Sequence, residues 1–399
     1  MSNQAPKATL RVAGLFAGIG GIERGLHKAG HECVFLCESD PAARVVLRRR
    51  FPEVRIRPDV RKLSSLPHVD VLAAGFPCQD LSQAGRASGI HGGKSGVVSK
   101  LFSLLEERSP RWRPNWLLVE NVPFMLHLDG GRAIKYLTDN LTSLGYSWAY
   151  RVLDTRAFGL PQRRRRVFLL ASREGDPREV LLADDVSEPA HATRTRQACG
   201  FYWTEGNRGL GWAVDAIPPL KGSSGLGIPS PPGVWMPNGA IAVPTIEDAE
   251  RLQGFPKFWT KPVTDAGMRE GARWRLVGNA VSVPVAEWIG GRLARPGKWE
   301  PWVEEVLVDG QRWPDAAWGK DAKAYRVERS PWPVSRMSTP LHEFLKGPRP
   351  LSWRAAAGFL ARVRASSLRV DERFMRDLSA HVAALRGLSM NGQAPRARR

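Results

Sequence analysis

Apolar runs alternate with amphipathic segments over residues 8–173, and this alternation constrains the fold more than any other feature of the chain. Helix signals separate the runs; Asp40, for example, is a favourable N-cap residue followed by a proline at the first helical position. Strands that alternate with helices predict an α/β fold, with an open, doubly wound and mostly parallel sheet covered by helices. The predicted strands are Leu10–Phe16, Glu32–Glu38, Val69–Ala74, Trp116–Glu120, Ser147–Leu153 and Val167–Ala171.

The alternation stops near Arg173, and composition divides the rest of the chain into three parts. The segment up to residue 243 is rich in Gly, Pro and Trp, which favours a small, loop-rich domain. Order resumes afterwards, and a Trp-rich region with helices predicted at 352–365 and 371–386 follows Arg295. The predicted divisions are 8–173, 174–243, 244–295 and 296–399.

The chain has 399 residues, with 59 Lys plus Arg against 39 Asp plus Glu, which gives a formal net charge of +20. This excess favours a polyanionic partner, first of all nucleic acid, although a merely basic surface is the plainer interpretation. Four cysteines form no C-x-x-C pair and eight histidines show no metal-binding spacing, so no metal site is predicted. We find no signal peptide or membrane-spanning run and expect a cytoplasmic protein without a membrane partner.

A glycine-rich turn, Phe-Ala-Gly-Ile-Gly-Gly at residues 16–21, follows the first predicted strand and opens a helix. Glycines at such a turn let a ligand approach the backbone N–H groups of a helix N-terminus. Glu38 ends the second strand, where an acid can hold ribose hydroxyls. Many α/β folds contain a similar turn, and Glu38 could equally be a solvated strand end.

The third predicted strand runs into Gly-Phe-Pro-Cys-Gln at residues 75–79, which places the thiol of Cys78 at the carboxyl edge of the sheet. Open α/β sheets bind ligands at that edge, but a lone cysteine is more often a buried packing residue. Glu120 ends the neighbouring strand, so its carboxylate is expected close to Cys78. Burial there would raise its pKa and suit it to proton donation.

A basic run, Gln162 to Arg166, stands immediately before the last predicted strand. Runs of this kind usually lie on a solvated face. The apolar strand that follows favours a place inside the structure instead.

These motifs together resemble the DNA cytosine-5 methyltransferases. The resemblance includes Pro-Cys-Gln at 77–79, Glu-Asn-Val at 120–122 and a Gln-x-Arg-x-Arg element at 162–166. A Gly- and Ser-rich loop, a Glu-Arg-Leu-Gln-Gly-Phe-Pro string and a Gly-Asn-Ala-Val string also follow the family's order, at 79–99, 250–256 and 278–281. The resemblance covers roughly three quarters of the chain.

The resemblance implies a Rossmann-like class I methyltransferase domain, a small target-recognition domain and S-adenosylmethionine as cofactor. The rest of the chain is expected to form a mainly helical C-terminal extension. Cys78 would be the nucleophile and Glu120 the acid, with Arg164 and Arg166 holding the base. Asp59 would meet the adenine of the cofactor. The cofactor-binding residues implied are Phe16, Gly18, Ile19, Gly21, Glu38, Asp59, Val60, Gly75, Pro77, Asn279 and Val281.

The chain also departs from the family pattern. Gly14 stands where the family often has Asp, which could alter hydrogen bonding in the cofactor loop. The loop after Cys78 has Lys and Val-Ser-Lys where an Asp and Arg-Gly are more usual. The region after Arg295 has no counterpart that can be placed from sequence, and the choice between a packed cap and a DNA- or protein-binding region stays open.

The function implied is methylation of cytosine C5 within a short sequence of double-stranded DNA, through base flipping and a covalent adduct between Cys78 and C6. A monomer acting beside a cognate restriction or defence protein is expected. The alternatives are an RNA (tRNA) cytosine-5 methyltransferase and a non-catalytic DNA-binding module. Possible base-reading residues in the recognition segment are Arg194, Arg196, Asn207, Arg208 and Asn238.

Overall fold

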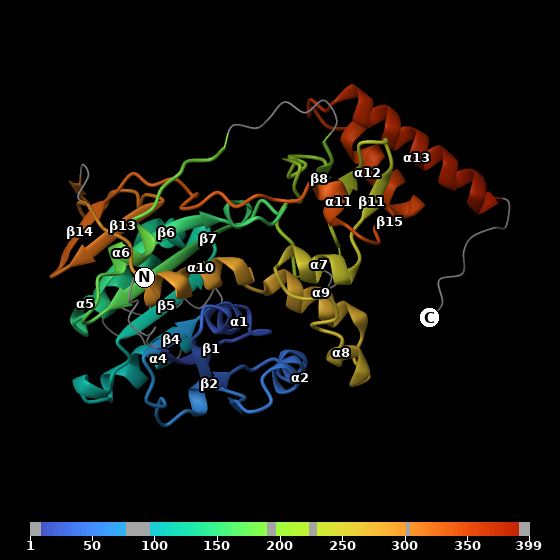
Figure 1. Cartoon of the computed structure of the whole chain (residues 1–399). Coiled ribbons are helices and arrows are strands. Elements are labelled where there is room, and N and C mark those ends of the chain that lie inside the picture. The colour runs from blue at the N-terminus through green and yellow to red at the C-terminus, as the bar shows by residue number, and fades with distance from the viewer. Residues whose placement is uncertain (1–8, 77–95, 190–196, 223–229, 301–303, 391–399) are drawn as a thin grey trace, which may run out of the picture.

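The computed structural model describes residues 9–76, 96–189, 197–222, 230–300 and 304–390, and these residues form two sheets (Figure 1). The main sheet has the strand order β12-β14-β13-β6-β7-β5-β4-β1-β2-β3. Its strands are β1 (Arg11–Leu15), β2 (Glu32–Cys37), β3 (Arg55–Arg57), β4 (Val71–Ala74), β5 (Trp116–Asn121), β6 (Ser147–Asp154), β7 (Arg165–Ser172), β12 (Glu305–Val306), β13 (Ala316–Lys320) and β14 (Lys323–Arg326).

The predicted strands are confirmed to within two residues at each end, and the strands β3, β2, β1, β4 and β5 pair in parallel. Strand β7 is different, because it runs antiparallel to both β5 and β6. Residues 155–164, which join β6 to β7, are too few for the helical crossover that a parallel connection requires. The sheet is therefore mostly, but not wholly, parallel.

Helices cover both faces of the main sheet, which makes it doubly wound (Figure 1). On one face, α4 (Val97–Glu106) and α5 (Arg132–Ser143) share a core with Ala13 and Leu15 of β1. On the other face, α1 (Gly21–Lys28), α6 (Pro177–Leu181) and α10 (Val283–Ala294) share a core with Val12. Successive side chains of β1 thus enter opposite cores, as the two-residue period of a strand requires.

Several short elements link these layers. Helix α2 (Pro41–Arg50) shares a core with α7 (Ile246–Leu252), α8 (Pro262–Asp265) and α9 (Glu270–Asn279). Asp40 caps α2 by accepting the backbone N–H of Ala42 at 2.8 Å, as the sequence predicts. Short 3-10 helices lie at η1 (Val60–Lys62), η2 (Pro110–Trp112), η3 (Pro123–Leu126), η4 (Leu128–Gly131) and η5 (Thr155–Phe158).

The second, smaller sheet is antiparallel and has the order β15-β11-β10-β8-β9. Its outer face is covered by two helices, α12 (Trp353–Arg364) and α13 (Glu372–Met390), close to the two that the sequence predicts. Phe359 and Phe374 place their ring centroids 5.1 Å from that of Phe201 on the sheet. The strands are β8 (Cys199–Phe201), β9 (Ala213–Val214), β10 (Gly233–Trp235), β11 (Ile241–Val243) and β15 (Arg349–Pro350).

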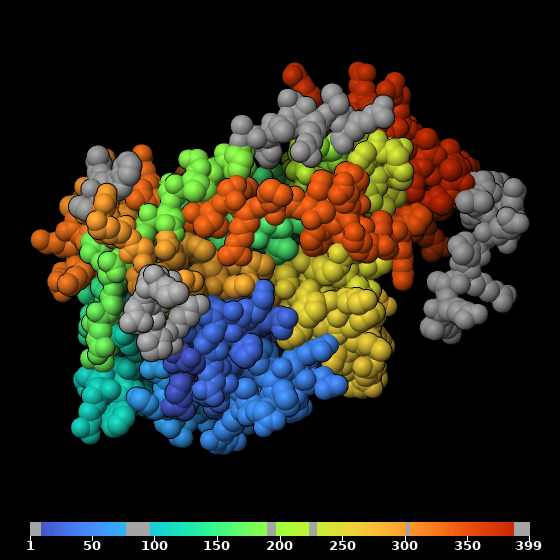
Figure 2. All heavy atoms as spheres, in the orientation of Figure 1, coloured from blue at the N-terminus to red at the C-terminus, as the bar shows by residue number. Residues whose placement is uncertain are grey.

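The last hundred residues contribute to both sheets. Strands β12 to β14 extend the main sheet beyond β6. Residues 327–340 then cross the surface toward the small sheet (orange in Figure 2), and Arg336 donates its backbone N–H to the Ala157 carbonyl on the way. After α11 (Leu341–Phe344), strand β15 pairs with β11, so the small sheet is built from two segments far apart in the sequence.

Ending the chain at residue 340 is expected to unfold the small sheet. It would remove Phe359, Phe374 and Leu378, all fully buried, at a cost of about 2–5 kcal/mol each. Together these losses rival the roughly 5–15 kcal/mol that stabilises a typical domain. Limited proteolysis should then cleave near Phe201 while the main sheet stays protected; equal protection of both parts would contradict the prediction.

Candidate active site

The glycine-rich turn after β1 forms a cradle in front of α1. Phe16, Gly18 and Gly20 all adopt left-handed backbone conformations, with φ of 56°, 55° and 82°. A Cβ atom on Gly21 would lie 2.5 Å from the carbonyl oxygen of Val281, so only glycine allows the returning chain to pass this closely. At Gly18, by contrast, a Cβ atom would meet nothing within 4 Å, which leaves open space on that side of the turn.

Two hydrogen bonds to other parts of the chain hold the turn in place. Ile19 is buried, and its carbonyl accepts a hydrogen bond from the Trp259 indole at 2.9 Å. The backbone N–H of Gly18 donates to Glu38 Oε2 at 2.8 Å. The ends of β1 and β2 are therefore held together by a carboxylate.

Glu38 follows the last residue of β2 and is 9 % exposed. Its second oxygen accepts the backbone N–H of Asp40 at 2.7 Å. Burial raises the pKa of Glu38, against the lowering effect of these two hydrogen bonds. Each carboxylate oxygen has capacity for a further donor, so the side chain can bind hydroxyl groups while it supports the turn.

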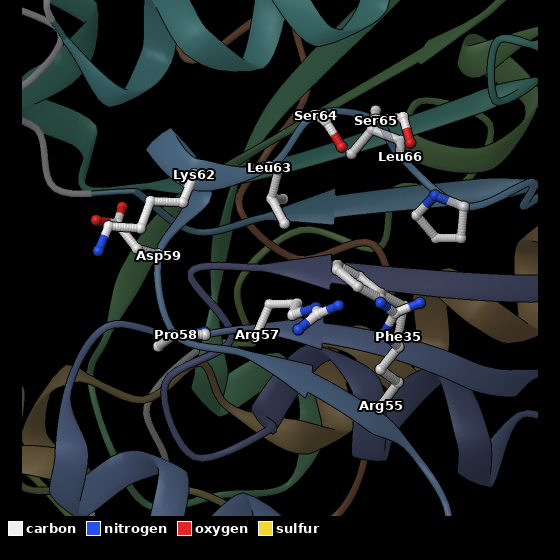
Figure 3. Close-up of a pocket in the computed structure, with 11 residues that line it drawn as sticks. Phe35, Arg55, Arg57, Pro58, Asp59, Lys62, Leu63, Ser64, Ser65 and Leu66 are labelled. Atoms are coloured by element: carbon white, nitrogen blue, oxygen red, sulfur yellow. The ribbon is translucent and has the colours of Figure 1, made fainter.

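Asp59 and Val60 lie after β3. Asp59 accepts hydrogen bonds at 3.0 Å from the backbone and the guanidinium of Arg61, which lowers its pKa. Val60 is buried. Figure 3 shows Asp59 at one end of a hollow of ≈ 440 Å³ that runs along β3 past Arg57 to Phe35.

The carboxyl ends of β4 and β5 meet beside Gly75 and Phe76. The Asn121 side chain donates to the Phe76 carbonyl at 3.0 Å and joins the two strand ends. A Cβ atom on Gly75 would lie 3.6 Å from Glu120 Oε2, so the Glu120 carboxyl lies beside the chain that leads to residue 78. Pro77 and Cys78 themselves lie outside the described residues.

Glu120 and Arg166 form a buried ion pair, with 3.2 Å between Glu120 Oε1 and Arg166 Nε. Glu120 comes from the end of β5, and Arg166 from the beginning of the antiparallel strand β7, so both stand at one sheet edge. Burial raises the pKa of Glu120 although Arg166 and Arg164 act to lower it. A carboxyl of this kind holds its proton at higher pH than an exposed one.

Arg164 has other partners, although the sequence places it in the same motif. Its guanidinium donates to the carbonyls of Leu220, Gly278 and Ala280 at 3.0–3.1 Å. The side chain is 2 % exposed. Arg164 therefore ties the main sheet to two later parts of the chain.

Sequence reasoning missed a buried polar network beneath this edge. Gln162 donates to the Leu252 carbonyl at 2.8 Å and accepts the backbone N–H of Leu220 at 2.9 Å. Ser282 Oγ donates to Gln253 Oε1 at 2.7 Å, and Gln253 lies 3.3 Å from the Gln162 amide. The two glutamines in the family-like strings 162–166 and 250–256 were the available signal.

The last two predicted cofactor residues, Asn279 and Val281, contact different parts of the chain. Val281 lies against Gly21 of the cradle, as described above. Asn279 ends α9 and is exposed, and a Cβ atom on Gly222 would lie 2.4 Å from its Oδ1. Asn279 thus contacts the chain that leads toward the small sheet.

Neither a cluster of metal-ligating side chains nor a membrane-spanning helix occurs among the described residues. No group of three or more His, Cys, Asp or Glu side chains in the described ranges is arranged to hold a metal ion. No helix in the same part of the chain is long and apolar enough to span a bilayer.

Comparison with known proteins defines the class of protein. The family model for C-5 cytosine-specific DNA methylases matches residues 10–199. A type II methyltransferase of Bacillus subtilis, M2.BsuMI, is 49 % identical over 380 residues, which cover 92 % of this chain and 97 % of that protein. The chain belongs to the C-5 cytosine-specific DNA methylase family and is a DNA cytosine-5 methyltransferase.

More distant relatives agree with this assignment. M.BsuFI, also a type II methyltransferase of Bacillus subtilis, is 29 % identical over 301 residues, 70 % of this chain and 71 % of the relative. Among solved structures, the Entamoeba histolytica methyltransferase EhMeth superimposes with a TM-score of 0.50 at 13 % identity, over 70 % of this chain and 96 % of that one. That likeness supports the fold alone.

Proposed function

We propose that the enzyme methylates C5 of a cytosine flipped out of a short, specific sequence of double-stranded DNA, with S-adenosylmethionine as methyl donor. The observation that carries this proposal is the buried ion pair between Glu120 and Arg166, which lies beside Gly75. Gly75 is three residues before Cys78, the cysteine of the Pro-Cys-Gln motif. A flipped base is required because C5 and C6 cannot be reached by a protein nucleophile inside a stacked duplex.

The cradle fits the proposed cofactor. Gly18 leaves space above backbone N–H groups at a helix N-terminus, and Glu38 stands where it can accept ribose hydroxyls. Phe16, Ile19, Gly21 and Val281 shape this cradle, and Asp59–Val60, Gly75–Pro77 and Asn279 are proposed at its margins. When bound, S-adenosylmethionine supplies an electrophilic methyl group on a sulfonium.

Replacing Glu38 with alanine should weaken cofactor binding. The partly buried N–H of Gly18 would lose its acceptor, which costs about 1 kcal/mol, and the ribose would lose a partner as well. We expect the dissociation constant of S-adenosylmethionine to rise roughly tenfold or more, measured by calorimetry without DNA. Glu32→Ala, on the exposed beginning of the same strand, is the control; equal affinities in both variants would remove Glu38 from the site.

The proposed chemistry begins at the cysteine. The Cys78 thiolate adds to C6 of cytosine while the Glu120 carboxyl donates its proton toward N3, which makes C5 nucleophilic. C5 then forms a bond to the methyl group, and the bond between that methyl and the sulfonium sulfur would break, which leaves a neutral thioether. Removal of the C5 proton by a base expels the Cys78 sulfur as a thiolate and restores the C5–C6 double bond, while the proton on N3 returns to Glu120.

The two arginines are proposed to act differently. Arg166 touches Glu120 and can hold the base oxygen and favour the thiolate of Cys78 by its charge. Arg164, whose donors are directed to backbone carbonyls, is proposed to position the edge on which Arg166 and Glu120 stand. The sequence motif gives both arginines a catalytic role, whereas this assignment keeps that role for Arg166 alone.

The setting of the reaction is also a proposal. The relatives named type II methyltransferases support a role in a restriction–modification system, in which methylation protects a sequence from a cognate nuclease. We propose a monomer that acts on DNA in the cytoplasm, with that nuclease as its functional partner.

One experiment tests the proposal as a whole. Purified protein is incubated with labelled S-adenosylmethionine and either unmethylated genomic DNA or total tRNA, and 5-methylcytosine is then mapped by sequencing. Label in DNA within one sequence context is the expected result. Label in tRNA alone would replace DNA with RNA as the substrate, and binding without label would favour a non-catalytic DNA-binding protein.

A further inference from the structure

A short hairpin loop follows β8 and joins it to β9 in the small sheet. The Tyr202 backbone N–H donates to the Leu210 carbonyl at 2.7 Å, and that of Gly206 donates to the Gly209 carbonyl at 3.3 Å. These bonds close a loop with two exposed residues, Asn207 and Arg208, at its tip. We call residues 203–211 the reading loop.

The base of the reading loop contacts the basic run at 162–166, which contains Arg166. Arg163 donates to the Gly211 carbonyl at 3.2 Å, and Tyr202 is close enough to Arg164 and Arg166 for their charges to affect its pKa. A DNA duplex whose cytosine enters the proposed site beside Arg166 would therefore lie near the base of this loop. Arginine and asparagine are the side chains that pair best with the edges of guanine and adenine in the major groove.

The opposite side of the reading loop rests on helix α12, from the C-terminal region. Arg362 donates to the Trp203 carbonyl at 2.7 Å and, through Nε, to the Glu205 carbonyl at 2.9 Å. A Cβ atom on Gly206 would lie only 3.3–3.4 Å from Val363, Arg362 and Phe359, so the loop backbone packs directly on the helix. One guanidinium thus holds two backbone carbonyls of the loop.

We propose that Arg362 is a specificity-determining positioning residue, which holds the reading loop so that Asn207 and Arg208 contact the bases that flank the target cytosine. The C-terminal region then acts in DNA recognition through the loop, without touching the bases itself. This inference rests on the proposed sequence-specific methylation of duplex DNA. Its physical basis is that a bidentate base contact tolerates little displacement of the side chain that makes it.

The test compares Arg362→Met with a matched arginine on the neighbouring helix. Arg373 of α13 also donates to a backbone carbonyl, that of Pro237 at 2.9 Å, and lies over the Trp235 ring, but it does not reach the reading loop. Both methionine variants keep an apolar stem and lose the donors. Methylation is mapped by sequencing over a DNA library randomised around the cognate site, and kcat and KM are measured on the cognate duplex.

For Arg362→Met we expect the preference at one or more flanking positions to fall roughly tenfold, the scale of one lost bidentate base contact. KM for DNA should rise while kcat stays within about twofold, since the catalytic edge is intact. Arg208→Ala should relax the same positions, and the double variant should be no worse than either single one. Arg373→Met should keep the wild-type preference.

Three outcomes would overturn the proposal. One is an unchanged preference in Arg362→Met with only a lower melting temperature, as a purely structural role predicts. Another is relaxation at positions that Arg208→Ala and Asn207→Ala leave untouched. The third applies if Arg362→Met does not fold. Arg362→Lys can reach one carbonyl but not both, and a full wild-type preference in that variant would then contradict the proposal. A wild-type protein that methylates DNA without any sequence preference would instead refute the proposed function on which the inference rests.

Discussion

Replacing Cys78 with alanine is expected to abolish methyl transfer, with a fall in rate of at least ~10⁴-fold, the scale on which loss of a covalent nucleophile acts. Without the thiolate, C5 of cytosine is too weak a nucleophile to attack a methyl sulfonium. DNA binding should remain, because the basic surface and the small sheet are unchanged. Rates are measured with labelled S-adenosylmethionine, and affinity by titration of a labelled cognate duplex.

Two controls make this result specific to the nucleophile. Cys199→Ala removes a buried thiol from β8 and should leave the rate of methyl transfer largely intact. A duplex with 5-fluorocytosine at the target should trap wild-type protein as a covalent complex, because the fluorine at C5 cannot leave as a proton does. Turnover by Cys78→Ala, or trapping of that variant, would refute the assignment.

The second large effect is expected for Glu120→Gln, with a loss in kcat of about 10²–10⁴-fold, the range for a positioned general acid. Glutamine keeps the shape of the side chain but cannot transfer a proton to N3. It also leaves the buried Arg166 without a carboxylate partner, so Glu120→Asp serves as the matched control that keeps the charge. A Gln variant as active as wild type would exclude Glu120 from proton transfer.

The pH dependence gives an independent check on Glu120. Burial raises its pKa, so the proton-donating form persists to higher pH than for an exposed carboxyl. The rate of adduct formation should fall as pH rises through that pKa, and this limb of the profile should be absent in Glu120→Gln. A profile that is the same in both proteins would contradict the proposed role.

Much of the main sheet could be predicted from sequence because its elements are local. Apolar runs of four to eight residues form buried strands wherever helices cover both faces, and Asp40 followed by proline marks the beginning of α2. The same holds for α12 and α13, whose apolar residues recur with helical spacing. The reversed direction of β7 depends on the length of its connection to β6, a feature that the apolar pattern of the strand does not contain.

In the candidate site, too, some features could be predicted from the sequence and others depend on how the strands pair. The chain pattern places Glu38 and Glu120 at strand ends, and the structure brings these ends to one edge because parallel strands share it. Which arginine of the basic run meets Glu120 depends on the pairing of β7 with β5. Arg166 lies on the strand and reaches Glu120, whereas Arg164 precedes the strand and is directed to the carbonyls of residues 220, 278 and 280.

The sequence by itself determined the class of fold and the order of the motifs, and it predicted the residues that are proposed to carry the chemistry, since each depends on residues close together in the chain. Only the tertiary structure decided what the last hundred residues do. Strand β15 and the helices after it complete the small sheet, and Arg362 holds a loop more than 150 residues earlier in the chain. Contacts over such separations arise from packing two apolar faces against each other, and the local pattern of either segment does not specify its partner.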